Sequence, residues 1–411
     1  MASKYGQPEV LIGADTRESA GWIAELVAGG LRGHGVRVRY AGVITTPGVA
    51  YLTRTEPFAA GVMISASHNP YQDNGLKVFS RSGFKLPDEE EHTIEQEIFA
   101  LLDGGVKPDG IALETDETLA RRYLDYLLST VRGSLSGVKI AIDCGNGASC
   151  RLAPELFHET GAEVAAYCCE PNGRNINLNC GALHLELLQE AVVKSGAHFG
   201  VAFDGDADRA IFVSSQGNVI NGDGVLLAAS RALKADGHLP GDLVVTTVMA
   251  NLGLERALAD CGIRMVRTPV GDKYVLEEMV RLGAALGGEQ SGHIIFREYS
   301  TTGDGLLTAL RMFEIANASG LGLDELTSDL KIYPQRLVNV RVREKKSLTE
   351  LPAVANEIRR VEEVFGGSGR VLVRFSGTEP LARVMVEGPD LEQVNRFSES
   401  IADAIRREMG S

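Results

Sequence analysis

Short β-branched runs alternate with longer stretches of helical periodicity along most of this chain. The runs at 10–12, 61–64, 138–142 and 243–245 are each followed by glycine or polar residues. This alternation predicts parallel sheets covered by helices. With 411 residues, the chain is also longer than one hydrophobic core usually serves, so we expect several domains with clefts between them.

The domain organisation follows from where the pattern restarts. It restarts near Gly137 and near Asp242, which predicts three similar α/β domains over 1–134, 135–238 and 239–332. From Tyr333 the order changes to strand, helix, two strands and a final helix, which predicts a small α+β domain over 333–411. The expected fold class is therefore α/β, with three domains of mixed, mostly parallel sheets and a C-terminal α+β domain around a central cleft.

Three stretches have apolar residues at helical spacing, and we interpret them as helix faces buried in a core. The residues are Trp22, Ile23, Leu26, Val27 and Leu31 in the first stretch, Ile94, Ile98, Leu101 and Leu102 in the second, and Val275, Leu276, Met279 and Val280 in the third.

Composition excludes several classes of partner. The formal net charge of -14 disfavours binding to nucleic acid or to an anionic membrane, so an anionic ligand must be held by local groups. Neither a bilayer-spanning apolar run nor a secretory signal is recognisable, and we expect a cytoplasmic protein. The six cysteines lack C-x-x-C spacing and are interpreted as buried or incidental thiols.

The first candidate site is the polar segment at 64–70, which follows a predicted strand. Ligands of open α/β sheets bind beyond the carboxyl ends of strands, and Pro70 prevents the segment from continuing as a helix. Ser67 is thus placed for nucleophilic attack, with His68 beside it and Lys77 nearby to offset the charge of a phosphoserine. An ordinary turn explains this segment equally well.

The second candidate site has three carboxylates at alternate positions after the apolar run at 199–203. Asp204, Asp206 and Asp208 offer oxygen ligands, which suit a hard cation such as Mg²⁺. A calcium loop of the EF-hand type is disfavoured because Arg209 and Ser215 stand where that loop needs glycine and glutamate. A solvated acidic turn is the remaining alternative.

Two further segments have the composition of ligand loops. The glycine-rich segment 287–293 presents Glu289 and Ser291, which could bind sugar hydroxyls, although a flexible turn is as good an explanation. The segment 374–380 combines an arginine with small donors, and another arginine follows. Arg374, Ser376, Gly377, Thr378 and Arg383 could form a phosphate site, with a structural turn and a solvated arginine as the alternative.

Taken together in this order, the four motifs resemble the α-D-phosphohexomutase superfamily over almost the whole chain. The resemblance implies that Ser67 is phosphorylated and that Mg²⁺ binds Asp204, Asp206, Asp208 and the phosphoserine. It also implies proton transfer by groups around Ser67, sugar binding and phosphate binding. The implied catalytic residues are Ser67, His68, Lys77 and His293, and the implied substrate-binding residues are Thr268, Gly271, Asp272, Lys273, Glu289, Ser291, Arg374, Ser376, Gly377, Thr378 and Arg383.

Within the superfamily, the segments 64–70, 269–275, 287–294 and 301–305 look like those of the phosphoglucosamine mutases. The resemblance implies a hexosamine phosphate substrate, a hexosamine 1,6-bisphosphate activator and a possible homodimer. A Phe-Gly-Thr-Asp-Gly-Val-Arg-Gly segment normally opens members of this family and is absent ahead of 10–17. A catalytically weak sugar-phosphate-binding homologue is therefore kept as an alternative. A phosphomannomutase or phosphoglucomutase, which would have the same chemistry with different discrimination at C2, is the other alternative.

Overall fold

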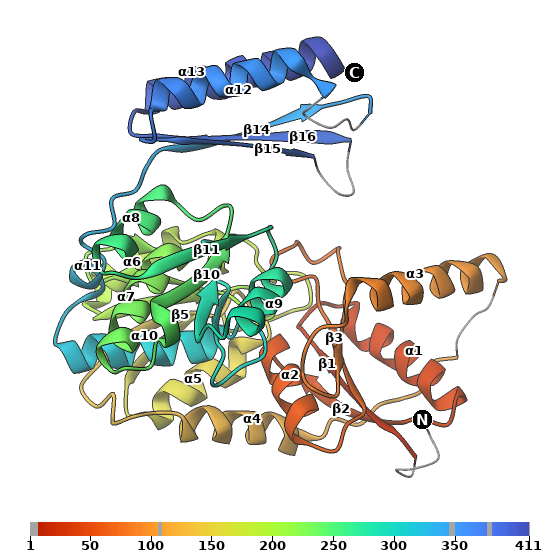
Figure 1. Cartoon of the computed structure of the whole chain (residues 1–411). Helices are drawn as coiled ribbons and strands as arrows, with labels where there is room; N and C mark the ends of the chain where they lie inside the picture. The colour runs from red at the N-terminus through yellow and green to blue at the C-terminus, as the bar shows by residue number, and fades with distance from the viewer. Residues whose placement is uncertain (1–6, 106–108, 345–349, 376–379, 411) are drawn as a thin grey trace. The chain divides into compact units, whose positions relative to one another are not determined.

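The computed structural model describes residues 7–105, 109–344, 350–375 and 380–410. The chain forms two compact units (Figure 1). The first comprises residues 1–249 and 262–328, and the second comprises residues 250–261 and 329–411. The first unit contains three sheets, and the second contains one.

The first sheet has the strand order β2-β1-β3-β4, with β1, β2 and β3 parallel and β4 antiparallel. Its strands are β1 (Glu9–Ala14), β2 (Arg37–Val43), β3 (Ala60–Ile64) and β4 (Leu76–Ser80). The accompanying helices are α1 (Ala20–Gly33), α2 (Thr46–Thr55), α3 (Asp88–Asp103) and α4 (Glu117–Ser129). Because β3 ends at Ile64, the Ser67 segment leaves the carboxyl edge of this sheet, as the sequence predicts.

The second sheet has the order β6-β5-β7-β8-β9, in which β5, β6 and β7 are parallel and β8 and β9 are antiparallel. Its strands are β5 (Lys139–Asp143), β6 (Glu163–Tyr167), β7 (Phe199–Phe203), β8 (Ala210–Ser214) and β9 (Val219–Ile220). Helices α5 (Ser149–Glu159), η1 (Gly181–Leu183), α6 (Glu186–Ser195) and α7 (Gly222–Ala235) follow these strands. Strand β7 is fully buried and ends immediately before Asp204.

The third sheet has the order β11-β10-β12-β13, with β13 antiparallel to β12. It consists of β10 (Leu243–Thr247), β11 (Arg264–Thr268), β12 (Leu286–Gly288) and β13 (Ile294–Phe296). In this part of the chain lie η2 (Pro240–Asp242), α9 (Asp272–Leu282), α10 (Gly305–Ser319) and α11 (Leu323–Leu326). Val275, Leu276 and Met279 of α9 pack against Val245 and Leu243 of β10 in one core cluster.

The second unit contains α8 (Leu252–Asp260) and an antiparallel sheet of order β14-β16-β15. Strands β14 (Gln335–Arg341), β15 (Arg370–Phe375) and β16 (Leu381–Glu387) pack with α12 (Pro352–Phe365) and α13 (Leu391–Met409). The apolar core between these layers includes Val384, Phe397 and Ile401. This agrees with the predicted α+β order, and the fold class predicted from the sequence is confirmed.

For one helix, the prediction of a buried face is wrong. Helix α3 has no buried residue, and Ile94, Ile98, Leu101 and Leu102 are all exposed. Apolar spacing of 3.6 residues therefore marks one face of α3 without indicating what covers it. In α1 and α9, Trp22 and Val280 are likewise exposed, whereas the remaining stripe residues are half-buried or buried.

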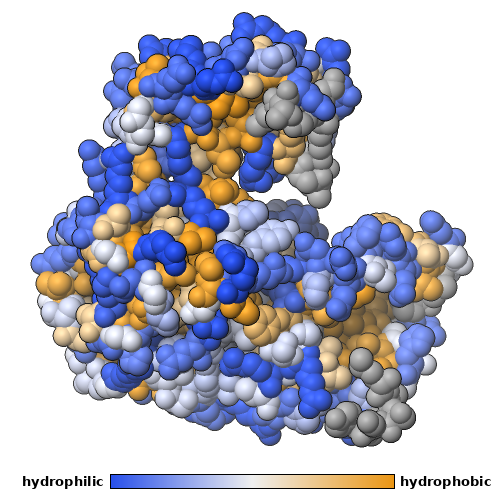
Figure 2. Space-filling view, viewed as in Figure 1, coloured by the Kyte–Doolittle hydropathy of each residue, from blue (hydrophilic) through white to orange (hydrophobic). Residues whose placement is uncertain are grey.

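The visible surface is mostly hydrophilic, with apolar side chains scattered among polar ones (Figure 2). Among the described residues, no helix combines the length and apolar character needed to cross a bilayer.

Candidate active site

The Ser67 turn is held by a buried arginine from the neighbouring strand end. Arg17 Nη2 donates to the carbonyl oxygens of Ser67 and Asn69, each at 2.9 Å, and Arg17 Nη1 donates to Asp73 O at 3.0 Å and to Pro70 O. The Arg17 guanidinium pairs with Asp15 at 2.8 Å, and both side chains are fully buried. One cation thus fixes the backbone of the whole turn.

Further contacts hold Ser67 in a conformation that side-chain-bearing residues rarely adopt. Its φ is 51°, in the left-handed region. The Ser67 amide donates to Ser65 Oγ at 2.9 Å, and Ser65 Oγ donates to Asp15 Oδ2 at 2.7 Å. Asn177 Nδ2, from the second sheet's loops, donates to Ser67 O at 2.9 Å. Such strain persists where surrounding contacts over-determine it, which is common at functional sites.

The three predicted metal-binding carboxylates lie next to Ser67. Ser67 Oγ donates to Asp204 Oδ2 at 2.5 Å. Carboxylate oxygens of Asp204, Asp206 and Asp208 lie within 4.8 Å of one another, and all three residues are buried. Burial, Asp208 and Asp206 raise the pKa of Asp204 to about 7. Buried anions this close together require cations.

This group of carboxylates fits a hard divalent cation. Asp206 Oδ1 is buried and accepts no hydrogen bond from any residue that the structure describes, and the cationic atoms facing Asp208 Oδ1 are His293 Nδ1 at 3.5 Å and Arg209 Nε at 3.9 Å. Asp206 Oδ2, in contrast, accepts from Thr46 Oγ1 and from Lys77. Buried oxygen atoms that converge from three carboxylates are suitable ligands for Mg²⁺. The sequence prediction that these residues could bind metal is consistent with this geometry.

Two cationic side chains offset the negative charge of the carboxylates. Lys77 Nζ lies 2.6 Å from Asp206 Oδ2 and 2.9 Å from Asp208 Oδ2. Burial lowers the pKa of Lys77, but Asp206 and Asp208 outweigh it and the net shift is upward. His293 Nδ1 lies 3.5 Å from Asp208 Oδ1 and its Nε2 lies 3.2 Å from Asp272 Oδ2. Burial lowers the pKa of His293, but Asp272 and Asp208 together raise it to about 10.

His68 differs from these two cations. Its Nδ1 lies 3.4 Å from Ser67 Oγ, and the residue is half-buried. Burial and the nearby Arg209 lower the pKa of His68 below its usual value of 6.5. At neutral pH His68 is therefore mainly uncharged, whereas Lys77 and His293 are charged.

The predicted sugar-binding loop lies beside the carboxylates. The Ala210 amide, which follows Arg209, donates to Gly292 O at 3.0 Å. Glu289 is buried and accepts from the Gly271 amide at 3.1 Å, so two of the predicted segments meet. Ser291 is exposed.

Most of the predicted substrate-binding residues in the segment 268–273 form ion pairs or hydrogen bonds with other residues of the protein. Asp272 Oδ2 lies 2.5 Å from Lys85 Nζ, and Lys273 pairs with Asp88 and Glu91 of α3. Thr268 is buried at the end of β11, where its hydroxyl donates to Thr246 O at 3.3 Å.

In the second unit, Arg374 of β15 and Arg383 of β16 are directly opposite in the antiparallel register. Like charges directly opposite are unfavourable, and burial together with Arg383 lowers the pKa of Arg374. An anion between the two guanidinium groups would relieve this repulsion. Ser376, Gly377 and Thr378 lie outside the described residues.

A pocket of about 380 Å³ adjoins the Ser67 turn. The residues that line it include His68, Pro70, Tyr71, Arg174 and His184. A smaller pocket, of about 50 Å³, includes Asp272 and Lys273.

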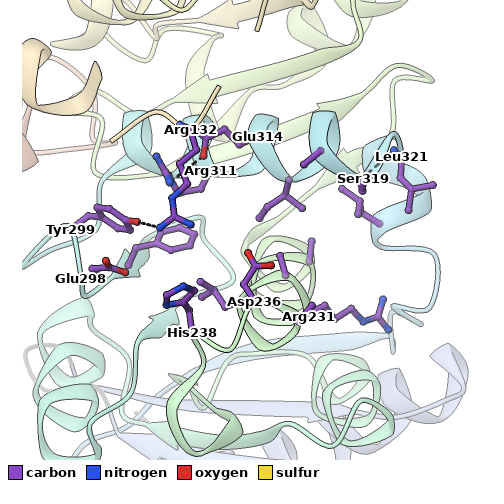
Figure 3. A pocket seen from close by; sticks show the side chains of 18 of the residues that line it. Arg132, Arg231, Asp236, His238, Glu298, Tyr299, Arg311, Glu314, Ser319 and Leu321 are labelled. Carbon is purple, nitrogen blue, oxygen red and sulfur yellow. Dashed lines mark hydrogen bonds and ion pairs between the residues drawn. The ribbon is translucent and has the colours of Figure 1, made fainter. Parts of the chain in front are cut away.

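A larger pocket, of about 520 Å³, contains none of the predicted site residues (Figure 3). Two of its arginines contact other residues that line it: Arg311 Nη1 lies 3.1 Å from Glu314 Oε2, and Arg132 Nη2 donates to Tyr299 Oη at 3.1 Å. The Ser67 region, where strained backbone, carboxylates and cations converge, is therefore the candidate active site.

Comparison with known proteins identifies the family of this chain. Family models for the phosphoglucomutase/phosphomannomutase α/β/α domains I, II and III match residues 1–103, 121–217 and 221–333, and the model for the C-terminal domain matches 337–404. The phosphoglucosamine mutase of Solibacter usitatus is 77% identical over 98% of this chain and 91% of its own length. The chain belongs to the phosphoglucosamine mutase family.

Solved structures of related proteins share the fold of this chain. A phosphoglucomutase/phosphomannomutase family protein from Burkholderia thailandensis has a TM-score of 0.78 at 22% identity, covering 98% of this chain and 90% of its own. The Aspergillus fumigatus N-acetylphosphoglucosamine mutase, solved with GlcNAc-6P and magnesium, has a TM-score of 0.65 at 19% identity, covering 88% and 91%. At these identities the likeness concerns the fold.

Sequence reasoning missed several residues of the candidate site. Arg17, Asp15 and Asn177 support the Ser67 turn, and Thr46 hydrogen-bonds Asp206. The sequence signal that could have identified Arg17 is its position two residues after an aspartate at the end of a strand. Asn177 lies in the asparagine-rich stretch 172–179, which carries no signal for a contact 110 residues away.

Proposed function

We propose that this chain interconverts glucosamine 6-phosphate and glucosamine 1-phosphate through phospho-Ser67 and a bisphosphate intermediate. The observation that carries the proposal is the convergence of Ser67 with the three carboxylates, Lys77, His68 and His293 in one site. The 77% identity to a phosphoglucosamine mutase supports the amino-sugar substrate over mannose or glucose phosphates. The product would serve as a precursor for amino-sugar nucleotides and cell-wall material.

In the proposed reaction, a sugar hydroxyl attacks the phosphorus of phospho-Ser67. The new phosphorus–oxygen bond to the sugar forms as the bond to Ser67 Oγ breaks, and the sugar hydroxyl gives its proton to a base. The resulting sugar bisphosphate reorients, and the reverse step returns its other phosphoryl group to Ser67. Phosphoryl transfer of this kind depends mainly on positioning and on electrostatic stabilisation of the transferring group.

The directions of the pKa shifts suggest different roles for the nearby side chains. Lys77 and His293 are raised in pKa and charged at neutral pH, so they are suited to stabilise negative charge and to donate a proton. His68 has a lowered pKa and lies against Ser67 Oγ, so it is suited to accept a proton. The resemblance implies that Lys77 and His293 assist proton transfer; because both are charged, we assign them proton donation, and His68 is the candidate base.

We assign Asp204, Asp206, Asp208 and phospho-Ser67 as the residues that would hold Mg²⁺. When bound, the ion supplies positive charge for the oxygens of the transferring phosphoryl group. Asp204 accepts the Ser67 hydroxyl hydrogen bond, so the same carboxylate orients the serine. Thr46 and Lys77 fix Asp206 from the opposite oxygen.

A second phosphate site is required because the intermediate carries two phosphates. We propose that Arg374 and Arg383, with Ser376, Gly377 and Thr378, bind the phosphate that does not react. The paired guanidinium groups on β15 and β16 support this assignment. Glu289 and Ser291 would bind sugar hydroxyls, and Thr268, Gly271, Asp272 and Lys273 would complete the substrate site. A homodimer stays a prediction from the family resemblance.

The decisive test is a coupled assay of glucosamine 1-phosphate formation with Mg²⁺ and a trace of the bisphosphate, together with intact-mass analysis. We expect turnover and one phosphate on the native chain, and neither in Ser67→Ala. Ser82→Ala, on an exposed turn, is the matched control and should retain both. Normal turnover by Ser67→Ala would contradict the phosphoserine mechanism, whereas binding of glucosamine 6-phosphate without turnover by the native chain would favour a sugar-phosphate-binding homologue.

A further inference from the structure

Five of the six cysteines gather at the carboxyl edge of β5 and β6. Cys144 follows β5, and Cys168 and Cys169 follow β6. Cys150 lies in the first turn of α5, and Cys180 directly precedes η1. All five are free thiols. The sheet topology therefore brings together thiols that the sequence separates by up to 36 residues, as counted from Cys144 to Cys180.

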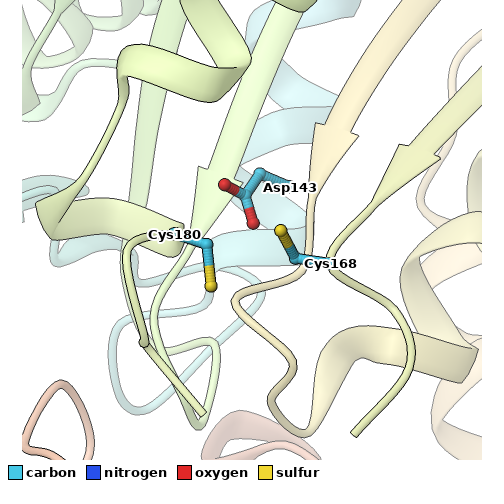
Figure 4. A group of neighbouring side chains, drawn as sticks. All are labelled: Asp143, Cys168 and Cys180. Atoms are coloured by element: carbon cyan, nitrogen blue, oxygen red, sulfur yellow. The ribbon is translucent and has the colours of Figure 1, made fainter. Parts of the chain in front are cut away.

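Two of these thiols converge with a carboxylate (Figure 4). Ligand atoms of Asp143, Cys168 and Cys180 all lie within 4.8 Å of one another. Asp143 and Cys180 are buried, and Cys168 is half-buried. The three side chains come from three separate segments, so their meeting is a property of the fold.

Surrounding groups fix the orientation of these side chains. The Gly145 amide donates to Asp143 Oδ1 at 2.8 Å, and the Gly181 amide donates to Asp143 Oδ2 at 2.9 Å. Asn146 Nδ2 lies 3.7 Å from Cys180 Sγ as a donor. Hydrogen bonds of this kind orient the side chains that bind the ion in metal sites. Each oxygen of Asp143 accepts one hydrogen bond and keeps a further lone pair for a ligand.

The backbone at Cys168 is also held in an unusual conformation. Its φ is 51°, in the left-handed region, where residues with a side chain are strained. The Cys168 carbonyl accepts from the Asn146 amide at 2.7 Å and from Cys150 Sγ at 3.6 Å. The fold therefore maintains a costly backbone conformation at one of the three residues of this group.

We propose that Asp143, Cys168 and Cys180 form a binding site for a soft divalent cation of the Zn²⁺ type, separate from the three carboxylates beside Ser67. Zinc–sulfur bonds of about 2.3 Å in a tetrahedral arrangement place ligand atoms about 3.7 Å apart. A group whose atoms already lie within 4.8 Å needs little contraction to reach this spacing. Two thiolates and one carboxylate leave a fourth position for solvent, next to the half-buried Cys168.

The site is linked to the Ser67 turn through the segment between its two cysteines. Asn177 lies in that segment and donates to Ser67 O at 2.9 Å and to Asn69 O at 3.2 Å. Gly181, next to Cys180, is so close to Phe203 O that an added Cβ would lie 2.7 Å from it. A cation at the cysteines would therefore restrain a segment that supports both the Ser67 turn and the strand end before Asp204.

Titration of the reduced full-length protein with Co²⁺ tests the proposal. Thiolate-to-cobalt charge transfer gives near-ultraviolet absorption, which the oxygen-only site at Asp204, Asp206 and Asp208 does not produce. We expect this absorption to saturate at one Co²⁺ per chain and to disappear when Zn²⁺ displaces the Co²⁺. Hydrogen exchange of residues 168–181 should slow when Zn²⁺ is added.

Matched variants locate the ligands. Cys168→Ser and Cys180→Ser should each lose the charge-transfer absorption and the slowing of exchange, whereas Cys261→Ser, in the second unit, should keep both. Because Cys168 is half-buried, its serine variant is the one that tests the site if Cys180→Ser fails to fold. The proposal is overturned if the native chain shows no charge-transfer absorption, or if the absorption persists in Cys168→Ser.

Discussion

Ser67 Oγ lies 2.5 Å from Asp204 Oδ2, so the candidate nucleophile and one candidate metal ligand share a hydrogen bond. The two residues are 137 positions apart in sequence and follow the carboxyl ends of β3 and β7 in different sheets. Asp204 is fully buried with Asp206 and Asp208. This relationship makes the protonation of Asp204 relevant to both serine orientation and cation binding.

Cation binding at the three carboxylates should weaken as the pH falls through about 7. Burial and the neighbouring carboxylates raise the pKa of Asp204 to about 7, and a proton there competes with the metal. One competing proton predicts that the apparent Mg²⁺ affinity falls by roughly fivefold from pH 7 to pH 6. Calorimetric titration at pH 6, 7 and 8 measures this, and a pH-independent affinity would contradict it.

Arg17→Lys should reduce turnover by at least roughly tenfold, because lysine cannot reproduce the planar fork that binds four carbonyl oxygens of the Ser67 turn. Weakening its buried pair with Asp15 should also lower stability, by up to about 3–5 kcal/mol if the pairing is lost. Kinetics and thermal unfolding measure the two effects. Arg151→Lys is the control, because its ion pair with Glu117 is exposed and should contribute little.

Lys77→Met should destabilise the first unit in the presence of a chelator, because Asp206 and Asp208 lose their shared cation. Added Mg²⁺ should then raise the melting temperature of Lys77→Met more than that of the native chain. Calorimetry with and without Mg²⁺ measures this difference. Lys194→Met, which removes an exposed ion pair with Glu190, should behave like the native chain, and an equal Mg²⁺ response in Lys77→Met would count against the shared site.

Asp304 should make the first unit less stable as the pH rises from about 4 to about 6. It is buried at the start of α10, where Tyr123 Oη donates to its Oδ2 at 2.8 Å, and burial raises its pKa from 3.8 to about 6. The folded state therefore binds a proton that the unfolded chain has already lost, and this contribution is full below pH 3.8 and is lost as the pH rises through about 6.

A pKa difference of this size corresponds to about 3 kcal/mol. Asp304→Asn should remove this pH-dependent contribution while keeping an oxygen acceptor for the Leu307 amide. Urea unfolding of both proteins between pH 4 and pH 7 gives the difference. A stability difference between them that does not change with pH would exclude a titrating Asp304.

The sequence determined the local elements and the four ligand segments. Runs of β-branched residues that end in polar loops placed Ser67 and Asp204 at strand ends, because a parallel sheet presents the carboxyl ends of its strands at one edge. Apolar periodicity also located α3, but the predicted burial of Ile94 and Ile98 was wrong. The spacing shows that these side chains share one face of a helix, and it does not show whether another element covers that face.

Tertiary structure alone decided which of these segments meet. Arg17, Asn177 and Thr46 reach the site from other elements, and no local pattern specifies contacts of 50 to 160 residues. The same holds for Asp143, Cys168 and Cys180, whose spacing in sequence is not that of a metal motif. Side-chain periodicity is local, whereas protonation states and ligand sets depend on burial and on groups that only the packed sheets bring within a few ångströms.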